Sequence, residues 1–316
     1  MLSRAELTAF IAQAILAPSS HNSQPWLFQV GENSIRLLAD RTRALPVNDP
    51  HDRELSISCG CALMNLRVAG AAAGYGSEVV YHPDPTDEDV LADLAFSGPA
   101  LDVLACLSKA IPNRRTYRKR FESEELPVDL ISELNSVTEA EGARLSVIHD
   151  EGQRQLICDL VVKGDALQWD NPSWRRELAQ WMHPRRAGDG LAMPALAAPL
   201  ARALVRRFDL GNGVAAQDHE LANQAPLLAV ISTEQDRTQD WLSAGQALQR
   251  FLLTAAVAGA QASYLNQPIE IPELRAKVSK LVGDEQQPQI LLRAGYPEDT
   301  LAAAPRRPLG DVIVTH

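Results

Sequence analysis

The fold is decided by two stretches of equal length, CGCALMNLRVAGAAAGYGSEVVYHP at residues 59–83 and AGQALQRFLLTAAVAGAQASYLNQP at residues 244–268. Each stretch indicates an Ala-rich helix that a glycine ends, followed by a strand that a proline ends. Aligned at a shift of 185 residues (244 − 59), they share Gly60 with Gly245, Ala62 with Ala247, Leu63 with Leu248, Ala71 with Ala256, Ala73 with Ala258, Gly74 with Gly259 and Pro83 with Pro268. Ala-rich helices match one another easily, but the shared glycine and proline mark element boundaries. The pattern therefore predicts that one helix-plus-strand unit occurs twice.

Hydrophobic spacing indicates the elements that precede and follow the first stretch. Apolar residues recur at helical spacing over residues 7–15, and a loop follows at residues 17–25. Two runs at residues 26–30 and 34–39 predict a pair of strands, and a further short strand is expected at residues 90–96. The loop therefore lies between a helix and a hairpin.

The second half repeats this opening in a shorter form. Residues 129–147 indicate a helix and a strand, but the short run 139–142 stands where the first half has its long loop. An addition at residues 165–210, rich in Trp, Arg and Ala, predicts helices that form either a lid or an outer layer. We expect a first half at residues 1–100 and a second at 101–316, joined in one compact body. The predicted fold class is α+β: a mixed, largely antiparallel sheet with flanking helices, duplicated internally as a pseudo-dimer.

Composition places the chain among ordinary globular proteins. Its 316 residues are 46% hydrophobic, which is enough to bury a sizeable core. The formal net charge of -10 and the pI near 5.2 argue against nucleic-acid binding, because that binding needs an excess of Lys and Arg. The cysteines follow no disulfide or zinc pattern, and no apolar run approaches the roughly 20 residues that span a bilayer. We therefore expect a cytoplasmic protein without a metal site that binds neither nucleic acid nor a membrane.

A basic segment, NRRTYRKRF at residues 113–121, carries five cations within seven positions. If the segment is extended, Arg114, Thr116 and Arg118 point to the same side, because side chains alternate along a strand. Two guanidinium groups beside a hydroxyl can bind a phosphate or a carboxylate. A second basic pair stands at residues 306–307. The alternative is that both groups form solvated surface, and the basic pattern alone leaves this open.

The loop after the first helix has the sequence PSSHNSQPW at residues 18–26. Hydroxyl, amide and backbone N–H groups crowd between two prolines that restrict the backbone, so the loop is suited to hydrogen-bond a ligand. An ordinary turn or helix cap uses the same residue types. His21 is a candidate general base, but the sequence identifies no partner carboxylate, so we assign it no catalytic role. No Gly-x-Ser-x-Gly motif supports a serine hydrolase.

Taken together, the loop, the RRTYR segment at residues 114–118 and the RRPL run at residues 306–309 resemble the FMN-binding signatures of the nitroreductase family. More narrowly, APSSHNSQPW at residues 17–26, DRTRALP at residues 40–46 and AGQALQR at residues 244–250 are similar to its Acg-type subfamily. Members of that subfamily resemble a nitroreductase dimer fused into one chain. The resemblance covers essentially the whole chain and implies the nitroreductase-like fold and an FMN cofactor.

The resemblance divides the pieces of the flavin site between the two halves. In ordinary nitroreductases one subunit offers the loop and the other offers the basic residues. Here the first half keeps the loop without a basic segment before its first helix, and the second half keeps the basic residues without the loop. The resemblance therefore implies one FMN site per chain rather than two. The cofactor-binding residues that it implies are Pro18, Ser19, Ser20, Asn22, Arg114, Thr116, Arg118, Glu270 and Arg307.

Two positions depart from the family pattern. The run Pro268–Ile271 has isoleucine where the family has a glycine after the acidic residue, which narrows access to the flavin at that point. Residues 218–224 give no clear match to the Asn and Lys that family members often carry before the central strand. Contacts to the polar edge of the flavin ring are therefore not assigned.

The resemblance implies an oxidoreductase that passes two electrons from NADH or NADPH through FMN to a small acceptor, such as a nitroaromatic compound or a quinone. No side chain is needed as a catalytic acid or base, because the flavin carries the chemistry. No GxGxxG motif opens a strand-helix unit, so the nicotinamide is expected as a transient substrate. Two alternatives stay open: a protein that binds or sequesters FMN with little turnover, and an enzyme that consumes its own reduced FMN with oxygen. Because the usual dimer interface would lie inside the chain, we expect a monomer or a weak homodimer.

Overall fold

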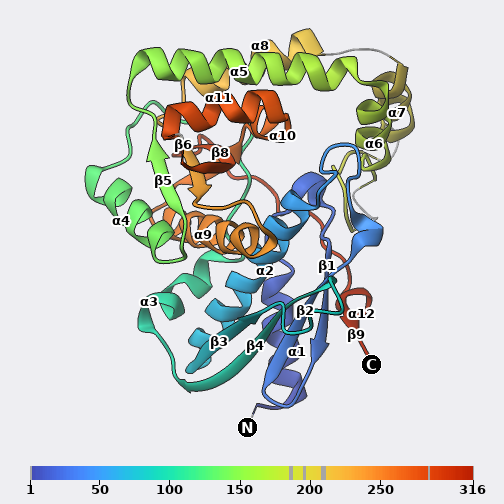
Figure 1. Ribbon diagram of the computed structural model, residues 1–316, viewed down its shortest axis with the longest axis vertical. Helices are drawn as coiled ribbons and strands as arrows, with labels where there is room; N and C mark the ends of the chain where they lie inside the picture. The colour runs from blue at the N-terminus through green and yellow to red at the C-terminus, as the bar shows by residue number, and fades with distance from the viewer. Residues whose placement is uncertain (1, 185–187, 195–196, 208–210, 284, 316) are drawn as a thin grey trace.

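The structure is a computed structural model that describes residues 2–184, 188–194, 197–207, 211–283 and 285–315 (Figure 1). The elements up to residue 100 are α1 (Arg4–Ala14), the 3-10 helix η1 (Ser20–Asn22), β1 (Trp26–Val30), β2 (Ser34–Ala39), the 3-10 helix η2 (Arg41–Arg43), α2 (Arg53–Ala72), β3 (Tyr75–Tyr81) and β4 (Val90–Pro99). Both strands of the predicted hairpin are confirmed with their predicted bounds. The last strand, β4, is longer than predicted.

The rest of the chain carries more helix. Its elements are α3 (Asp102–Ala105), the 3-10 helix η3 (Cys106–Ala110), α4 (Val128–Glu139), β5 (Arg144–Val147), α5 (Glu151–Asp170), α6 (Pro172–Gln180), α7 (Ala198–Arg207), α8 (Gly211–Asn223), β6 (Leu227–Thr233), α9 (Thr238–Val257), β7 (Gln261–Tyr264), α10 (Gln267–Glu270), α11 (Pro272–Val282), β8 (Gln287–Gly295), α12 (Leu309–Val312) and β9 (Ile313–Val314). Of the predicted helical addition, residues 185–187, 195–196 and 208–210 lie outside the described residues.

The described strands form two sheets, one with the order β3-β4-β2-β1-β9 and one with the order β5-β6-β8-β7. Neighbouring strands are antiparallel except β1 and β9, which run parallel. Long helices flank both sheets (Figure 1). The predicted α+β class, with largely antiparallel strands and flanking helices, is therefore confirmed. The strands form two sheets where one was predicted, and β9 of the second half joins the first sheet.

The two sheets repeat one strand order. In chain order β1 to β4 correspond to β5 to β8, and the orders β3-β4-β2-β1 and β7-β8-β6-β5 are then the same. The repeated stretches of sequence are α2 with β3 and α9 with β7. Both observations support an internal duplication, and common ancestry of the halves stays a prediction.

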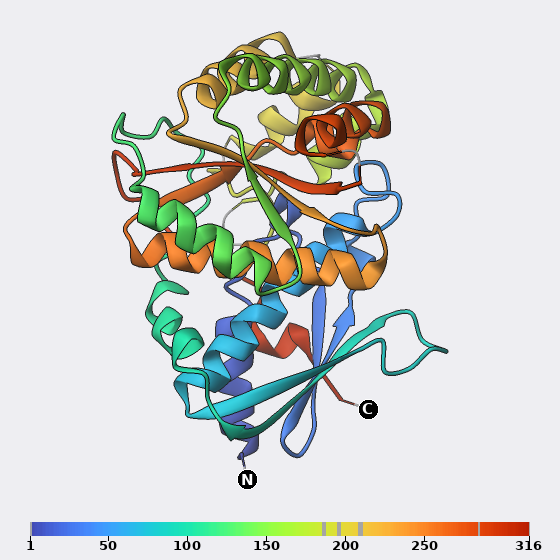
Figure 2. The same cartoon turned by 60° about the vertical axis from the view of Figure 1, so that its left-hand side comes forward.

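Helices α2 and α9 cross at the centre, between the two sheets (Figure 2). Gly60 of α2 and Gly245 of α9 lie at the crossing, where a methyl group on Gly60 would clash with the carbonyl oxygen of Leu242 and reach the Cα of Gly245 at 3.0 Å. A methyl group on Gly245 would clash in turn with the carbonyl oxygen of Ile57. The pairs 57 and 242, and 60 and 245, differ by the same 185 residues, so the contact is reciprocal, as across a two-fold axis.

The principal apolar core extends across both halves. Leu63 and Leu66 of α2, Phe251 of α9, and Leu37 and Ile231 of the two sheets belong to one buried cluster. Among the described helices, α2 is the one that is long and apolar enough to cross a bilayer, and 89% of its apolar window is buried inside the protein. It is therefore packed as the core helix of a globular protein is.

The C-terminal segment crosses from the second half to the first, whereas the basic segment pairs within the second half. The C-terminal strand β9 adds to β1 of the first sheet (Figure 1). The basic segment lies beside β7 of the second sheet, where Thr116 forms an isolated bridge with Ala262 and the Tyr117 N–H donates to the Ala262 carbonyl at 2.9 Å. A second isolated bridge joins Phe121 and Pro297, so the segment is irregular with two isolated bridges and is not a continuous strand. Both contacts bring together residues that are distant in sequence.

Candidate functional site

The loop after α1 has a strained backbone. His21, Asn22 and Gln24 have φ values of 52°, 54° and 54°, in the left-handed region that residues other than glycine rarely adopt. The Ser19 hydroxyl accepts a hydrogen bond from the Gln24 N–H at 2.9 Å, and the Ser19 carbonyl accepts one from the Asn22 N–H at 2.9 Å. Pro18 at its start is buried. A backbone strained in this way persists only where surrounding contacts hold it, which is common at binding sites.

Contacts with two distant segments hold the loop. The Asn22 side chain donates to the carbonyls of Gly190 at 3.3 Å and Pro305 at 3.1 Å, and it accepts from Arg306 at 3.0 Å. The Gln24 side chain donates to the Gly188 carbonyl at 2.9 Å. The loop is therefore tied to the helical addition and to the C-terminal segment. The described contacts occupy the Asn22 amide, so its role here is to shape the loop.

Three arginines near this loop lack a counterion. Arg114 is 5% exposed, and its Nε has no hydrogen-bond partner in the described structure. Within the described residues, its side chain makes one long hydrogen bond, which it donates to the Thr116 hydroxyl at 3.5 Å. Arg118 is exposed and makes no hydrogen bond or ion pair within the described ranges. Arg306 donates to main-chain carbonyls, including those of Leu16 at 3.0 Å and Ala17 at 3.2 Å, but to no carboxylate.

The arginines repel one another. Burial, and then the charges of Arg114 and Arg115, lower the pKa of Arg306 to about 9. The pKa of Arg114 is lowered by burial and then by Arg115 and Arg118. Protein atoms also surround Arg118 closely enough to lower its pKa by desolvation, although part of the residue meets solvent. Like charges that are removed from solvent and lack counterions repel one another. A bound anion would therefore stabilise this cluster.

Arg307, which the sequence placed in the site, is neutralised by another residue. Its guanidinium forms an ion pair with Asp40 at 3.0 Å and donates to the Gln24 carbonyl at 2.9 Å. Its N–H also donates to the Gln24 side chain at 2.9 Å. Arg307 thus braces the loop, while its neighbour Arg306 carries the unneutralised charge. Because Arg306 and Arg307 are adjacent, the sequence alone does not indicate which of them faces the cluster.

Carboxyl groups gather on the other side of the loop. The Ser20 hydroxyl donates to Glu54 at 2.6 Å, and the Asn266 side-chain amide donates to the same carboxylate at 3.1 Å. Glu270 accepts from Gln168, and burial together with the Glu54 charge raises the pKa of Glu270 well above its usual range. Glu54 is 3% exposed and belongs to no motif, so sequence reasoning missed it.

His21 lies between the arginines and the carboxyl groups. Burial lowers the pKa of its imidazole to about 4, with Glu54 opposing and Arg118 reinforcing the shift. The ring is therefore neutral at pH 7. No described side chain hydrogen-bonds to it. The structure thus joins Asn22 to Arg306 and Ser20 to Glu54, and His21 between them feels the charges of both Arg118 and Glu54.

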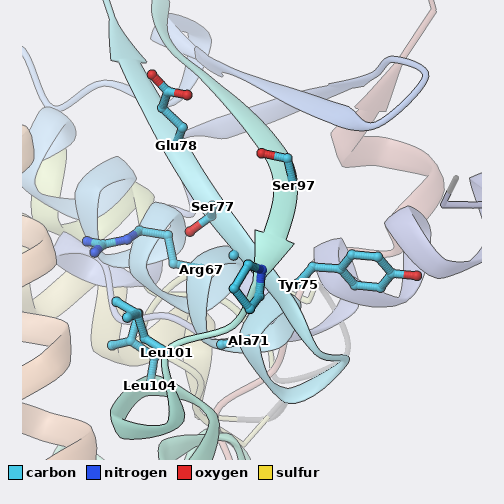
Figure 3. Close-up of a pocket in the computed structure, with 10 residues that line it drawn as sticks. Arg67, Ala71, Tyr75, Ser77, Glu78, Ser97, Leu101 and Leu104 are labelled. Atoms are coloured by element: carbon cyan, nitrogen blue, oxygen red, sulfur yellow. The ribbon is translucent and has the colours of Figure 1, made fainter.

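Two surface pockets lie apart from these residues. The first, about 250 Å³, is lined by Arg67, Ala71, Tyr75, Gly76, Ser77, Glu78, Ser97, Pro99, Leu101 and Leu104, between α2 and the edge formed by β3 and β4 (Figure 3). The second, about 330 Å³, lies beside the ion pair of Arg43 and Asp189 and the ring of Trp181. None of the predicted cofactor residues lines either pocket. Neither is therefore assigned to the cofactor.

The buried carboxyl group of Asp165, which lies near Asp218, makes the free energy of unfolding depend on pH. Asp165 is 2% exposed, and burial and the charge of Asp218 raise its pKa to about 7, although Gln267 donates to it at 3.2 Å. Between about pH 4 and pH 7 the unfolded state ionises this group while the folded state keeps the proton. Stability attributable to Asp165 therefore falls as the pH rises through this window and stays low above it.

Asp165→Asn should relieve that penalty. We expect the variant to be more stable than the wild type by about 1 to 2 kcal/mol at pH 8, with the difference shrinking towards zero near pH 4. Denaturant unfolding at both pH values measures it. An equal change at both pH values would show that altered packing, not ionisation, is responsible.

Comparisons with known proteins place the chain in a family. No family model matches the chain. Solved nitroreductases with bound FMN from Desulfitobacterium hafniense and Bacteroides fragilis are 14% and 15% identical, with TM-scores of 0.45 and 0.43. Each covers 66% of this chain, and the matches cover 97% and 98% of those chains. These likenesses are too partial to carry the assignment, which rests on sequence relatives.

The sequence relatives match almost from end to end. The Mycobacterium tuberculosis protein named provisionally as the NAD(P)H nitroreductase acg is 32% identical over 312 residues, covering 95% of this chain and 92% of that protein. An uncharacterised protein of the same species is 31% identical over 315 residues, covering 95% and 90%. A Serratia protein named provisionally as the NAD(P)H nitroreductase PigM is 23% identical, covering 96% and 91%. At this identity and coverage, the chain belongs to the nitroreductase family, in its Acg-type subfamily.

Proposed function

We propose that the chain is an FMN-dependent oxidoreductase that passes two electrons from NADH or NADPH to a small acceptor, such as a nitroaromatic compound or a quinone. The observation that carries this proposal is the cluster of Arg114, Arg118 and Arg306, which lacks a carboxylate partner among the described residues. The phosphate of FMN is an anion of the kind that guanidinium groups bind. Family membership supplies the second support.

The residues present fit this cofactor. Arg114, Arg118 and Arg306 would hold the phosphate, and Thr116, Ser19 and Ser20 would supply hydroxyl groups. Pro18, Asn22 and Arg307 would shape the loop, and Glu270 would lie on the carboxyl side of the site. When bound, FMN would supply the electron-transfer chemistry, while the protein binds, orients and tunes it.

We further propose that residues 1–100 and 101–316 are the two halves of one flavin site. The loop comes from the first and the arginines from the second. In the second half the short run that replaces the loop contains Glu141, which is bonded to Arg67 of α2 and accepts from Arg250 of α9 at 2.7 Å. The Glu141 carboxylate thus gives Arg67 and Arg250 the negative charge that a bound anionic ligand would otherwise supply. A single site per chain and a monomer or weak homodimer follow from this arrangement, and we propose a cytoplasmic location separately, from the composition of the chain.

A second function, FMN sequestration with little turnover, is favoured by one observation. The helical addition reaches the loop through the carbonyls of Gly188 and Gly190, and Asp189 pairs with Arg43. An addition seated against the loop would restrict the entry of a donor or an acceptor. The two functions differ in turnover and not in flavin binding.

Anaerobic stopped-flow spectroscopy separates the two functions. For the oxidoreductase we expect NADPH or NADH to bleach the bound flavin, and a quinone or a nitroaromatic compound to restore its colour. Flavin that stays oxidised with both donors, yet bleaches with dithionite, would favour sequestration. A protein that binds no FMN would contradict both.

A further inference from the structure

The carboxyl group of Glu54 joins the loop of the first half to the second half. Glu54 lies in the first turn of α2 and is 3% exposed. Its Oε2 accepts a hydrogen bond from the Ser20 hydroxyl at 2.6 Å, and its Oε1 accepts one from the side-chain amide of Asn266 at 3.1 Å. Arg53, which is 7% exposed, also donates to Oε1, at 3.4 Å. One carboxyl oxygen thus binds the loop, and the other binds a residue of the second half.

Both groups that bind Oε1 can only donate to it. The main-chain N–H of Leu291 donates to the side-chain oxygen of Asn266 at 3.0 Å, so the NH2 group of this amide faces Glu54. The guanidinium group of Arg53 has no acceptor atom. A proton on Oε1 would meet these donors, and donors of this kind favour the ionised form of a carboxyl group. Glu54 is therefore a carboxylate, paired with Arg53.

The Ser20 hydroxyl must then be the donor in its bond with Glu54. A serine hydroxyl has one proton and two lone pairs, whereas a carboxylate only accepts. The distance of 2.6 Å is typical of a hydroxyl that donates to a charged oxygen. Ser20 is half-buried, and within the described structure its hydroxyl makes no other hydrogen bond. Its lone pairs are therefore available to a ligand, and its proton is not.

We propose that Glu54 is a positioning residue of the flavin site, which fixes the Ser20 hydroxyl as a hydrogen-bond acceptor towards the cofactor. This inference rests on the proposed function. The ionised phosphate of FMN offers only acceptor oxygens, so this hydroxyl cannot bond to it. The ring and the ribityl chain of FMN carry N–H and O–H donors, so Ser20 binds that part of the cofactor. The phosphate is left to the arginine cluster, which the loop reaches through the bond of 3.0 Å between Asn22 and Arg306.

Riboflavin, which lacks the phosphate, separates the two parts of the cofactor in equilibrium titrations of the flavin-free protein. Ser20→Ala should raise the Kd for FMN by about threefold to tenfold, because one hydrogen bond is lost, and should raise the Kd for riboflavin by the same factor. Arg114→Ala should raise the Kd for FMN alone. If Ser20→Ala lost affinity for FMN but kept that for riboflavin, the hydroxyl would be a donor to the phosphate, and the proposal would be overturned.

Glu54→Gln should reverse the direction of the Ser20 hydroxyl. The glutamine oxygen would face the two fixed donors and its NH2 group would face Ser20, so the hydroxyl would turn its proton towards the cofactor. This variant should weaken the binding of both flavins as Ser20→Ala does. If Glu54 acts through Ser20, the double variant should bind FMN as Ser20→Ala does, within about twofold. Effects that multiply would mean that Glu54 only supports the fold, and would overturn the proposal.

Glu141→Gln is the matched control for the loss of a buried carboxylate. The Glu141 side chain is 5% exposed and binds Arg67 and Arg250. This variant should lose stability in denaturant but keep the wild-type Kd for both flavins, and a rise equal to that in Glu54→Gln would overturn the proposal. Should Glu54→Gln fail to fold, Ser20→Ala with the two flavins decides alone. A wild type that binds neither flavin would contradict the proposed function, whereas unchanged binding in Ser20→Ala would overturn this inference only.

Discussion

Arg114→Ala will weaken FMN binding by about 1.5 to 3 kcal/mol, which is roughly a tenfold to hundredfold rise in Kd. Arg114 is 5% exposed and lacks an ion-pair partner in the described chain, so its charge is available to the phosphate. Equilibrium titration followed by flavin fluorescence measures the change. The flavin-free variant should lose no stability, because the substitution removes a buried charge without a counterion.

Arg120→Ala is the matched control for this prediction. Arg120 belongs to the same basic segment, but it is exposed and has no described partner. Its removal should change the FMN affinity by less than about 0.5 kcal/mol. Equal losses in both variants would mean that the segment acts through its general charge, and an unchanged Kd in Arg114→Ala would remove Arg114 from the site.

Gly245→Ala will destabilise the protein by about 3 kcal/mol or more, because overpacking at a helix crossing forces the backbones apart. A methyl group there would clash with the carbonyl oxygen of Ile57 and lie 2.9 Å from the Cα of Gly60. Neither neighbour is the end of a flexible side chain, so neither can move aside cheaply. Denaturant unfolding at pH 7 measures the loss, and Gly60→Ala should show a similar one.

Gly213→Ala provides the matched control. Gly213 lies within α8, and a methyl group there would meet nothing within 4 Å. Alanine is a better helix former than glycine, so this variant should gain up to about 1 kcal/mol. If Gly245→Ala were as stable as the wild type, α2 and α9 would not cross as closely as described.

Sequence patterns predicted the elements that have local signals. The hairpin strands, the loop between two prolines and the repeated helix-plus-strand unit each follow from spacing or from residues that punctuate the chain. The division of the strands into two sheets was not predicted, because strand pairing depends on contacts between segments far apart. The same strand order in both sheets supports an internal duplication. The identities within the Ala-rich helices are weaker support, because such helices match one another easily.

The site was predicted only in part for the same reason. Arg114 and Thr116 were predicted from their cluster, and the structure places both beside Tyr264, while their role in binding the cofactor stays a prediction. Glu54 was missed because an acidic residue in the first turn of a helix ordinarily favours the helix dipole, a role that needs no ligand. Arg306 and Arg307 are adjacent, and only the three-dimensional contact with Asp40 shows which of them is neutralised.

The central claim is that the chain builds one flavin site from its two halves. Titrating the purified, flavin-free protein with FMN, while measuring the bound flavin and the mass of the complex in solution, tests this claim most directly. The account predicts saturation at one FMN per chain, in a species that need not dimerise to bind it. Saturation at two FMN per chain, at one FMN per two chains, or no binding at all would contradict it.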